Sequence, residues 1–253
     1  MSNSDEQNNN IQNVIKIQES DIEQLLNIIP NSENLSLIYK YHIRDQKNRN
    51  TCIINATLSL IEYLRQLEGY EYTILSSSFL YHFSVKEEIN RYNGYNQNSG
   101  IHTISVLKSL LKNGVCDQKR WESVFDFNIK PSTKAIVNAL SRLKDCNIEI
   151  IPNSLNVIRY VIGVTKRPIV AVIPSDIFDG NINTENHSVL FVGYDSEYIY
   201  YQNSYGESWG NKGFGKFEVT LVDQIINMYT MDQTCLKSLD YIFRPIKTRK
   251  IIK

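Results

Sequence analysis

The chain has 253 residues, of which 42% are hydrophobic and 21% are charged, and these proportions are typical of a globular protein large enough for two lobes. Lys and Arg together number 27, as do Asp and Glu, and this balance argues against a nucleic-acid-binding protein and against an acidic tail. No apolar run approaches the roughly 20 residues of a membrane-spanning helix.

Residues 1–28 are predicted to form a leader in front of the folded domain. Residues 1–10 (MSNSDEQNNN) are polar and of low complexity, which predicts disorder and argues against a secretory signal. Apolar residues then recur at helical spacing from Val14 to Ile29, and Ser20 precedes Glu23 as in a capping box. The apolar face consists of Ile17, Ile22, Leu25 and Leu26. We expect a helix docked on the body, and two roles stay open for it: a short inhibitory propeptide or an inert leader.

The part of the chain from about residue 45 to 150 is predicted to be a mainly helical lobe. From Cys52 to Gly69, apolar residues cover nearly every face, which predicts a helix buried on all sides. Further helices are predicted over Ser76–Asn90, Ser105–Asn113 and Ser132–Cys146. Gly114 follows the second of these and is typical of a helix end.

The part from about residue 151 to 253 is predicted to be a mainly β lobe. Short runs of β-branched and aromatic residues alternate there with Gly, Asp, Asn and Pro. These runs are RPIVAVIP, HSVLFVGYD, EYIYYQNS, GFGKFEVT and LDYIFRP. A helical lobe followed by a β lobe predicts an α+β protein whose site lies in a cleft between the two.

Cys52 lies where a polar loop turns into an apolar helix. A thiol in the first turn of a helix experiences the positive end of the helix dipole and unpaired N–H groups, which favour the thiolate. Taken alone, Cys52 is better explained as one more small buried apolar side chain. Only other residues of the chain can support the interpretation of Cys52 as a nucleophile.

His187 begins one predicted strand and Asn203 ends the next, so a hairpin would bring both side chains to the same end of a sheet. Taken alone, they would be a core histidine and a turn asparagine. Together with a thiol at a helix start, an imidazole held by an amide oxygen is the arrangement that nucleophilic acyl transfer requires.

Four segments, in this order, resemble the papain family of cysteine peptidases, in its cathepsin-like, intracellular, microbial or viral branch. They are DQKNRNTC, SGIHTISVLKSLLKNGVC, NHSVLFVGYD and NSYGESWGNKGFGKFEV. The first places Gln46 six residues before Cys52, as in the family. The resemblance runs from about Ile29 to the end of the chain. It implies a two-lobed catalytic domain over residues 29–253 with a β-barrel-like second lobe and an active-site cleft between the lobes.

The resemblance also assigns catalytic roles. Cys52 would be the nucleophile and His187 the general base and acid, while Asn203 would orient the imidazole. Gln46 would donate its side-chain amide, together with the backbone N–H of Cys52, to the oxyanion of the tetrahedral intermediate. The implied reaction is hydrolysis of peptide bonds through an acyl-enzyme intermediate, without a metal or a cofactor.

Peptide or protein substrates would lie in the cleft. By resemblance, Gly100 would bind the substrate backbone and Trp209 would cover the leaving-group side. Three residues would line the pocket for the second residue before the scissile bond, and Asn186 beside the histidine would also contact substrate. The pocket residues are Ile101, Val172 and Ser188. We expect this pocket to prefer a bulky apolar side chain.

The chain departs from the family pattern at three places. Ile53 follows the nucleophile where the family has Trp, and Tyr205 stands where the family has Trp beside the orienting Asn. KNRNT replaces the cysteines and glycines before the nucleophile, which removes a family disulfide. These changes bear on rate and specificity, because all four chemical groups remain.

Cellular context and partners follow from cysteine usage and composition. The four cysteines are too sparse for a disulfide framework, and a glycan on the sequon at Asn55 would prevent packing of an apolar helix. The cysteines are Cys52, Cys116, Cys146 and Cys235. We expect an intracellular protein, cytoplasmic or within a virion, with no nucleic-acid or membrane partner; its oligomeric state and its physiological substrate stay open. Two other functions also stay open: a silent peptide-binding adaptor, and a thiol acyltransferase or isopeptidase.

Overall fold

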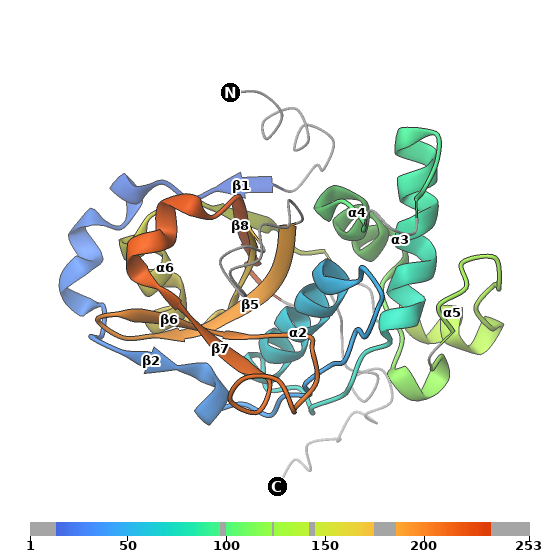
Figure 1. Cartoon of the computed structure of the whole chain (residues 1–253), viewed down its shortest axis with the longest axis horizontal. Coiled ribbons are helices and arrows are strands. Elements are labelled where there is room, and N and C mark those ends of the chain that lie inside the picture. The colour runs from blue at the N-terminus through green and yellow to red at the C-terminus, as the bar shows by residue number, and fades with distance from the viewer. Residues whose placement is uncertain (1–13, 97–99, 123, 142–144, 175–185, 234–253) are drawn as a thin grey trace, which may run out of the picture.

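The computed structural model describes residues 14–96, 100–122, 124–141, 145–174 and 186–233. These residues form a β-rich lobe and a helical lobe, with helix α2 (Cys52–Leu67) between them (Figure 1). α2 packs against strands of the β lobe on one side and against helices of the other lobe on the other side, and it is buried from Ile53 to Arg65. Because both lobes contact this helix, its first residue lies at their junction.

The helical lobe confirms most of the predicted helices. Besides α2 it contains α3 (Ser77–Tyr92), α4 (Thr103–Asn113) and α5 (Thr133–Leu140). The side chains of Ser76 and Ser132 cap α3 and α5 by accepting a backbone N–H of the first turn. α5 ends at Leu140 rather than at Cys146, which lies outside any helix; residues 142–144 are outside the described chain.

The β lobe is built on one mixed sheet in the order β1-β3-β8-β4-β5-β6-β7, with β2 also pairing with β5. Its strands are β1 (Val14–Lys16), β2 (Glu33–Asn34), β3 (Ile148–Ile151), β4 (Ile169–Pro174), β5 (Asn186–Tyr194), β6 (Tyr198–Gln202), β7 (Phe214–Glu218) and β8 (Asn227–Met231). All pairings are antiparallel except that of β1 with β3. Four predicted strands are confirmed as β4 to β7, whereas the run LDYIFRP lies outside the described residues.

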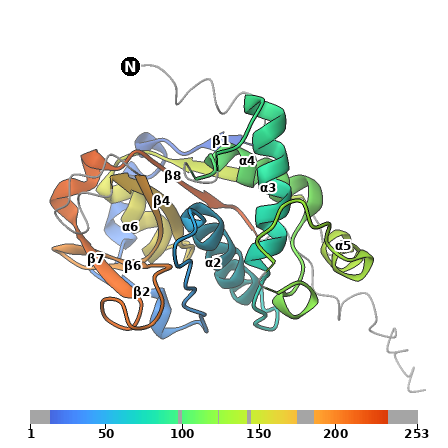
Figure 2. The ribbon, with the colours of Figure 1, turned by 45° about the vertical axis from the view of Figure 1, so that its right-hand side comes forward.

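The sequence analysis missed helix α6 (Leu155–Gly163) and strands β3 and β8. α6 packs against β4 and β5, and Figures 1 and 2 both place it within the curl of the sheet. The β-branched residues of α6 have a low helix propensity, so the sequence did not predict this helix. Ser154, which caps α6, could have indicated its start. β3 and β8 are short runs that become strands because each pairs with the other, a contact that local propensity cannot reveal.

The predicted helix over Val14–Ile29 is wrong. Val14–Lys16 instead forms strand β1, parallel to β3, and the N–H of Ile17 donates to the carbonyl of Ile150 at 3.2 Å. Short 3₁₀ helices follow over Glu19–Asp21 and Glu23–Ile28. The β-branched run VIKI favours a strand, and the available edge of β3 supplies the hydrogen bonds that make it one.

The predicted capping box and apolar face of that helix are also wrong. Gln18, not Ser20, caps the first 3₁₀ helix through Asp21, whose carboxylate accepts the Gln18 N–H at 2.9 Å. Of the predicted apolar face, Ile22 is buried but Leu26 is 42% exposed. The leader therefore adds a strand to the sheet instead of laying a helix on the body.

Across the described residues, every helix is too short or too polar to cross a lipid bilayer. α3 and α5 lie on the opposite side of α2 from the sheet (Figure 2).

Candidate active site

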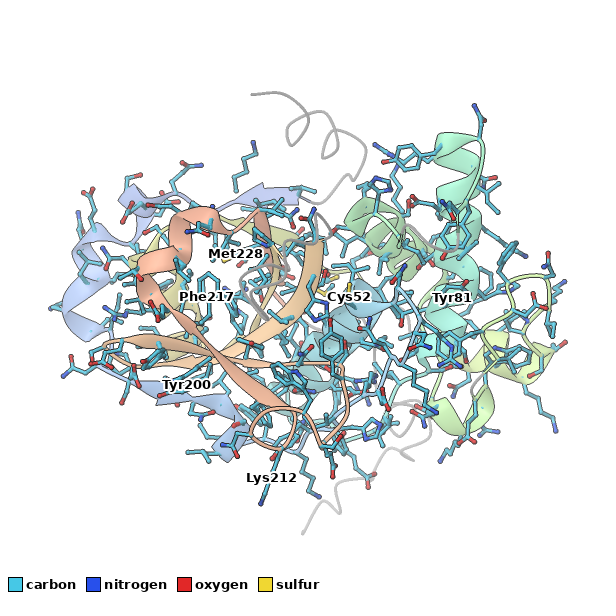
Figure 3. All side chains as sticks on the ribbon, viewed as in Figure 1. Cys52, Tyr81, Tyr200, Lys212, Phe217 and Met228 are labelled. Atoms are coloured by element: carbon cyan, nitrogen blue, oxygen red, sulfur yellow. The ribbon has the colours of Figure 1, made fainter. Side chains whose placement is uncertain are left out.

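Cys52 is the first residue of α2 and lies in the middle of the molecule, between the sheet and the helical lobe (Figure 3). Its side chain is partly exposed. Burial would raise the pKa of this thiol, but three favourable interactions outweigh it and hold the pKa below its usual value: a hydrogen bond to His187, the positive charge that His187 can carry, and hydrogen bonds from the backbone and hydroxyl of Ser188. The local environment therefore favours the thiolate.

His187 lies near the start of β5 and is 4% exposed. Its Nε2 is 2.8 Å from Oδ1 of Asn203, which directly follows β6. Asn203 is fixed in turn, since its backbone N–H donates to the carbonyl of Gly213 at 2.9 Å and its Oδ1 accepts the N–H of Ser204. The antiparallel pairing of β5 with β6 brings the imidazole and the amide together, as the predicted hairpin requires.

Tyr205 covers the His187–Asn203 pair. Its ring lies over the imidazole with centroids 4.8 Å apart and an angle of 32° between the planes, and its hydroxyl is 3.4 Å from Nδ1 of His187. Trp209 meets the Tyr205 ring edge-on at 5.9 Å. The imidazole is therefore packed against one aromatic ring, which a second ring contacts in turn.

Gln46 approaches from the loop before α2 and is 8% exposed. Its Oε1 accepts a hydrogen bond from the Ser204 hydroxyl at 2.6 Å, and its backbone N–H donates to the Ser204 carbonyl at 2.8 Å. With the oxygen engaged, the amide nitrogen is the end left to donate; one of its hydrogens goes to the carbonyl of Arg49. Ser204 was missed in the sequence, although it stands beside Asn203 in the NSYG segment that carries the resemblance.

Gly100 and Ile101 form a loop in front of α4. Gly100 has φ +73°, a left-handed conformation that favours glycine, and Ile101 is 9% exposed. The next residue, His102, is tied to Glu88 of α3 twice, through its side chain and through its backbone N–H. Burial opposes ionisation of Glu88, but its hydrogen bonds to His102 prevail and lower the pKa of the carboxyl, while Glu88 raises the pKa of His102. This carboxylate–histidine pair was not foreseen.

The predicted pocket residues Val172 and Ser188 lie opposite each other on β4 and β5. The backbone N–H and the hydroxyl of Ser188 form hydrogen bonds with the Cys52 sulfur. Ser188 therefore stabilises the thiolate, in addition to any part it has in the pocket. Asn186 begins β5 and is exposed. The predicted residues Gln46, Cys52, His187 and Asn203 are thus brought together, with Ser188 beside them.

A cavity of about 280 Å³ lies between α4 and the β3–β8 part of the sheet. It is lined by residues 16–18 of the leader, three residues of α4, residues 150–153 at and after the end of β3, and residues 226–229 at the start of β8. None of the predicted pocket residues lines it, but two are close to residues that do: Ile101 precedes Ile104 of α4 by three residues, and Val172 pairs with Asn227. The leader supplies one wall, which the sequence analysis did not predict.

This arrangement is able to perform acyl transfer. A thiol with a lowered pKa, an imidazole in contact with it, and amide donors at the start of a helix are the groups that attack a carbonyl and hold the resulting oxyanion. Among the described residues, no group of three His, Cys, Asp or Glu side chains gathers as a metal site would require.

Comparison with known proteins agrees with this geometry. The family model for papain family cysteine proteases matches residues 39–235. No curated protein matches the chain significantly. Among solved structures, xylellain, a cysteine protease from Xylella fastidiosa, is 18% identical with a TM-score of 0.71, and the match covers 87% of this chain and 95% of xylellain.

Two further structures are similar. Digestive procathepsin L 3 of Tenebrio molitor larval midgut is 17% identical with a TM-score of 0.65, over 80% of this chain and 70% of that one. The Carica candamarcensis cysteine protease CMS1MS2, solved in complex with E-64, is 16% identical with a TM-score of 0.61, over 81% and 99%. At such identities the structures show the α+β papain-like fold, and the family model covers more than half of the chain. The chain belongs to the papain family of cysteine proteases.

Proposed function

We propose that the protein is a peptidase that hydrolyses peptide bonds with Cys52 as nucleophile. One observation carries this proposal: the Cys52 thiol is hydrogen-bonded to His187, whose far nitrogen Nε2 is 2.8 Å from Oδ1 of Asn203. The hydrogen bond at Nε2 leaves Nδ1 to exchange a proton with the sulfur.

In the first half of the reaction, the Cys52 thiolate attacks the scissile carbonyl carbon while His187 holds the proton. The carbonyl oxygen becomes an oxyanion that accepts hydrogen bonds from the backbone N–H of Cys52 and from Nε2 of Gln46. His187 then gives its proton to the leaving amine, and the C–N bond breaks. A thioester between Cys52 and the acyl part of the substrate remains.

In the second half, a water molecule takes the place of the amine. His187 accepts a proton from the water as its oxygen attacks the thioester, and the same oxyanion donors act again. The C–S bond breaks, the acid leaves, and the thiolate–imidazolium pair is restored. Asn203 keeps the imidazole oriented in both halves, and the Tyr205 ring packs against it.

The specificity pocket follows from the cavity beside α4. We infer that the second residue before the scissile bond points past Ile101 and Val172 toward the 280 Å³ cavity that adjoins them. Ile17, Ile104 and Met228 contribute apolar surface there. A bulky apolar side chain is therefore the favoured occupant.

The test is a comparison of wild type with Cys52→Ala on a library of fluorogenic peptides, combined with intact-mass labelling by an epoxysuccinyl peptide. We expect turnover and one covalent adduct for wild type and neither for Cys52→Ala. Gln46→Ala should still be labelled at Cys52, but its kcat should be about 100- to 1000-fold lower, as expected for the loss of an oxyanion donor. Peptide binding without turnover or adduct by the wild-type chain would identify a silent adaptor instead.

A matched experiment separates hydrolysis from acyl transfer. Both reactions form the thioester, and they differ only in whether water or an amine consumes it. Adding a primary amine to the peptidase assay and measuring the ratio of amide to acid product distinguishes them. A product mixture dominated by amide at low amine concentration would contradict the proposal and identify a transferase.

A further inference from the structure

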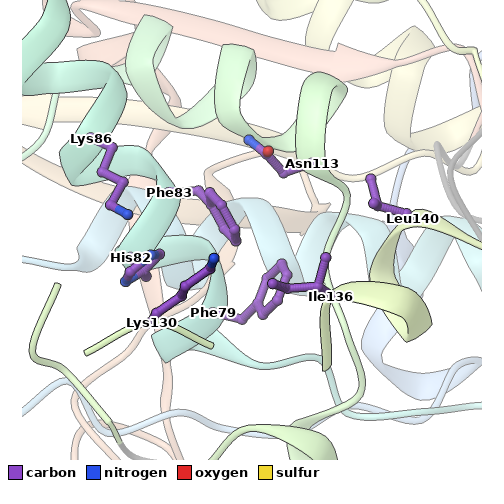
Figure 4. A pocket seen from close by; sticks show the side chains of 8 residues that line it. All are labelled: Phe79, His82, Phe83, Lys86, Asn113, Lys130, Ile136 and Leu140. Carbon is purple, nitrogen blue, oxygen red and sulfur yellow. The ribbon is translucent and has the colours of Figure 1, made fainter. Parts of the chain in front are cut away.

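A second cavity, of about 150 Å³, lies in the helical lobe. It is formed by α3, the last residue of α4, the loop before α5, and α5 itself (Figure 4). None of its eight lining residues belongs to the candidate active site or to the cavity beside the leader. Its chemistry is therefore independent of peptide hydrolysis.

The body of this cavity is apolar and of defined shape. Phe79 and Phe83 of α3 form one wall, with ring centroids 5.0 Å apart, and Ile136 and Leu140 of α5 form the facing wall (Figure 4). A protein cavity of about 150 Å³ with comparable lining takes up a benzene-sized molecule. The apolar part of a ligand should therefore be a single ring or a short branched chain.

The rim is basic. Lys86 and Lys130 are both exposed and line the cavity, and Figure 4 shows both of them near His82. Within the described chain, neither ammonium group has a carboxylate in ion-pair range; the lysine nearby that does, Lys112, is paired with Glu87. Two cations for which the described residues supply no counter-charge, beside an apolar cavity, complement an anion with an apolar body.

His82 provides a third polar group at the same place. It is 1% exposed and lines the cavity, and no described residue forms a hydrogen bond of ordinary geometry with either ring nitrogen. Burial and the charge of Lys86 lower the pKa of His82 to about 4, against a weaker effect of the Ile129 carbonyl, so the ring is neutral near pH 7. A neutral imidazole keeps one N–H to donate, and buried polar groups of this kind are normally satisfied by a partner.

We propose that this cavity binds a small carboxylate that carries one ring or branched chain. The apolar part lies between Phe83 and Ile136, and the carboxylate meets Lys86 and Lys130 with the His82 N–H as a further donor. The shared chemistry is found in a free aromatic acid and in the C-terminal residue of a peptide.

The test is titration of the full chain with phenylacetate, followed by calorimetry and by NMR of the Ile136 and Leu140 methyl groups. We expect a Kd on the order of 1 mM, as befits so small a ligand, with the largest shifts at these two methyl groups. Phenylacetamide has the same shape without the charge, and acetate has the charge without the ring. Both should bind at least about fivefold more weakly, because each lacks one of the two recognised parts.

Variants assign the binding to this cavity. Lys86→Met and Lys130→Met are exposed substitutions that should leave the fold intact and weaken phenylacetate by about two- to fivefold each. Lys134→Met, on α5 but outside the lining, is the matched control and should have no effect. Ile136→Phe, which fills the cavity without touching the lysines, should abolish binding.

Three results would overturn the proposal: no methyl shifts at the highest soluble phenylacetate concentration, equal affinity for phenylacetamide, or unchanged affinity in both lysine variants. A short peptide ending in Phe is titrated in the same way to distinguish the two sources. Shifts at Ile136 and Leu140 with phenylacetate and with the peptide would extend the site to C-terminal residues of peptides, whereas shifts with phenylacetate alone would restrict it to free acids.

Discussion

The thiol of Cys52 differs from those of Cys116 and Cys146 in exposure and in surroundings. Cys52 is partly exposed and contacts His187, whereas the other two are buried among apolar residues. Cys235 lies outside the described residues. We expect iodoacetamide to label Cys52 first, and the pH midpoint of labelling to lie below the value of about 8.5 of an ordinary thiol.

The direction of this pH dependence follows from the lowered pKa. The thiolate persists as the pH falls, and labelling declines only when the pH drops below the lowered pKa of Cys52. His187→Ala removes the main stabilising partner and should move the midpoint upward, while His42→Ala, outside the site, should not. Mass-spectrometric labelling rates over a pH series give the result; rapid labelling of Cys116 or Cys235 with Cys52 inert would exclude an active nucleophile at Cys52.

At the scale of elements, α2 is held against the loop that carries Gln46 by a buried ion pair. Nη2 of Arg44 and Oε1 of Glu62 are 2.5 Å apart, and both side chains are at most 6% exposed. Arg44 also donates to Ser59 and to the carbonyl of Leu75. The pair thus fixes the loop two residues before Gln46 to the middle of α2.

Glu62→Ala should therefore be strongly destabilising, because it leaves the Arg44 guanidinium buried without a counter-charge. We expect a loss of about 3–5 kcal/mol in the free energy of unfolding. Glu87→Ala is the matched control, since its partner Lys112 is 72% exposed, and it should change stability by less than about 1 kcal/mol. Urea denaturation of both variants measures the difference, and equal midpoints would contradict the role given to the pair.

A second pair of elements, α3 and the loop before α4, is joined by Glu88 and His102. Because Glu88 raises the pKa of His102 and His102 lowers that of Glu88, the two are oppositely charged between those values. As the pH rises through the raised pKa of His102, the imidazole loses its proton and the attraction fades. The loop with Gly100 should then be held less firmly.

The expected outcome is a rise in KM for peptides as the pH increases from about 6 to 9, with a smaller effect in Glu88→Gln, where the charge attraction is absent throughout. Glu87→Gln, one residue away, serves as the control. Only KM is compared, since kcat also reflects Cys52 and His187. A KM that follows the same pH course in wild type and Glu88→Gln would show that the pair does not govern substrate binding.

At the scale of the whole molecule, the leader lines the cavity beside α4 together with residues of both lobes. Ile17 follows β1 of the sheet and faces Ile104 and Leu107 of the helical lobe across that cavity. Ile17→Trp should narrow the cavity. We compare kcat/KM for two substrates that carry Leu or Ala at the second position before the cut, and we expect the Leu-to-Ala ratio to fall by at least about tenfold. Ile28→Trp, at an exposed leader position, is the control and should leave this ratio unchanged. An unaltered ratio in Ile17→Trp would place the specificity pocket elsewhere.

Sequence alone predicts the parts of this molecule that depend on local pattern. The buried helix from Cys52, the strands on either side of His187 and Asn203, and the two-lobed α+β fold all follow from periodicity and from ordered motifs. The structure of the leader could not be predicted from local pattern, because VIKI becomes a strand only by pairing with β3, some 130 residues later in the chain. Ser204 was missed for a similar reason, since its partner Gln46 is 158 residues away. The Glu88–His102 pair spans only 14 residues, but it depends on how α3 packs against the loop before α4, which the local pattern does not show.

The place of β1 in the sheet has one more consequence. β1 is the outermost described strand beside β3, it is only three residues long, and it ends in Lys16, features by which natural sheets avoid pairing with other molecules. Behind it, β3 offers Ile148, Ile150 and Ile151 in four residues. In a chain shortened to begin at Ile29, β3 would become an exposed, apolar edge strand with unpaired backbone N–H and C=O groups. Such chains would tend to pair edge to edge and aggregate. We therefore expect the leader to oppose association between copies of the chain, a role separate from any effect on substrate.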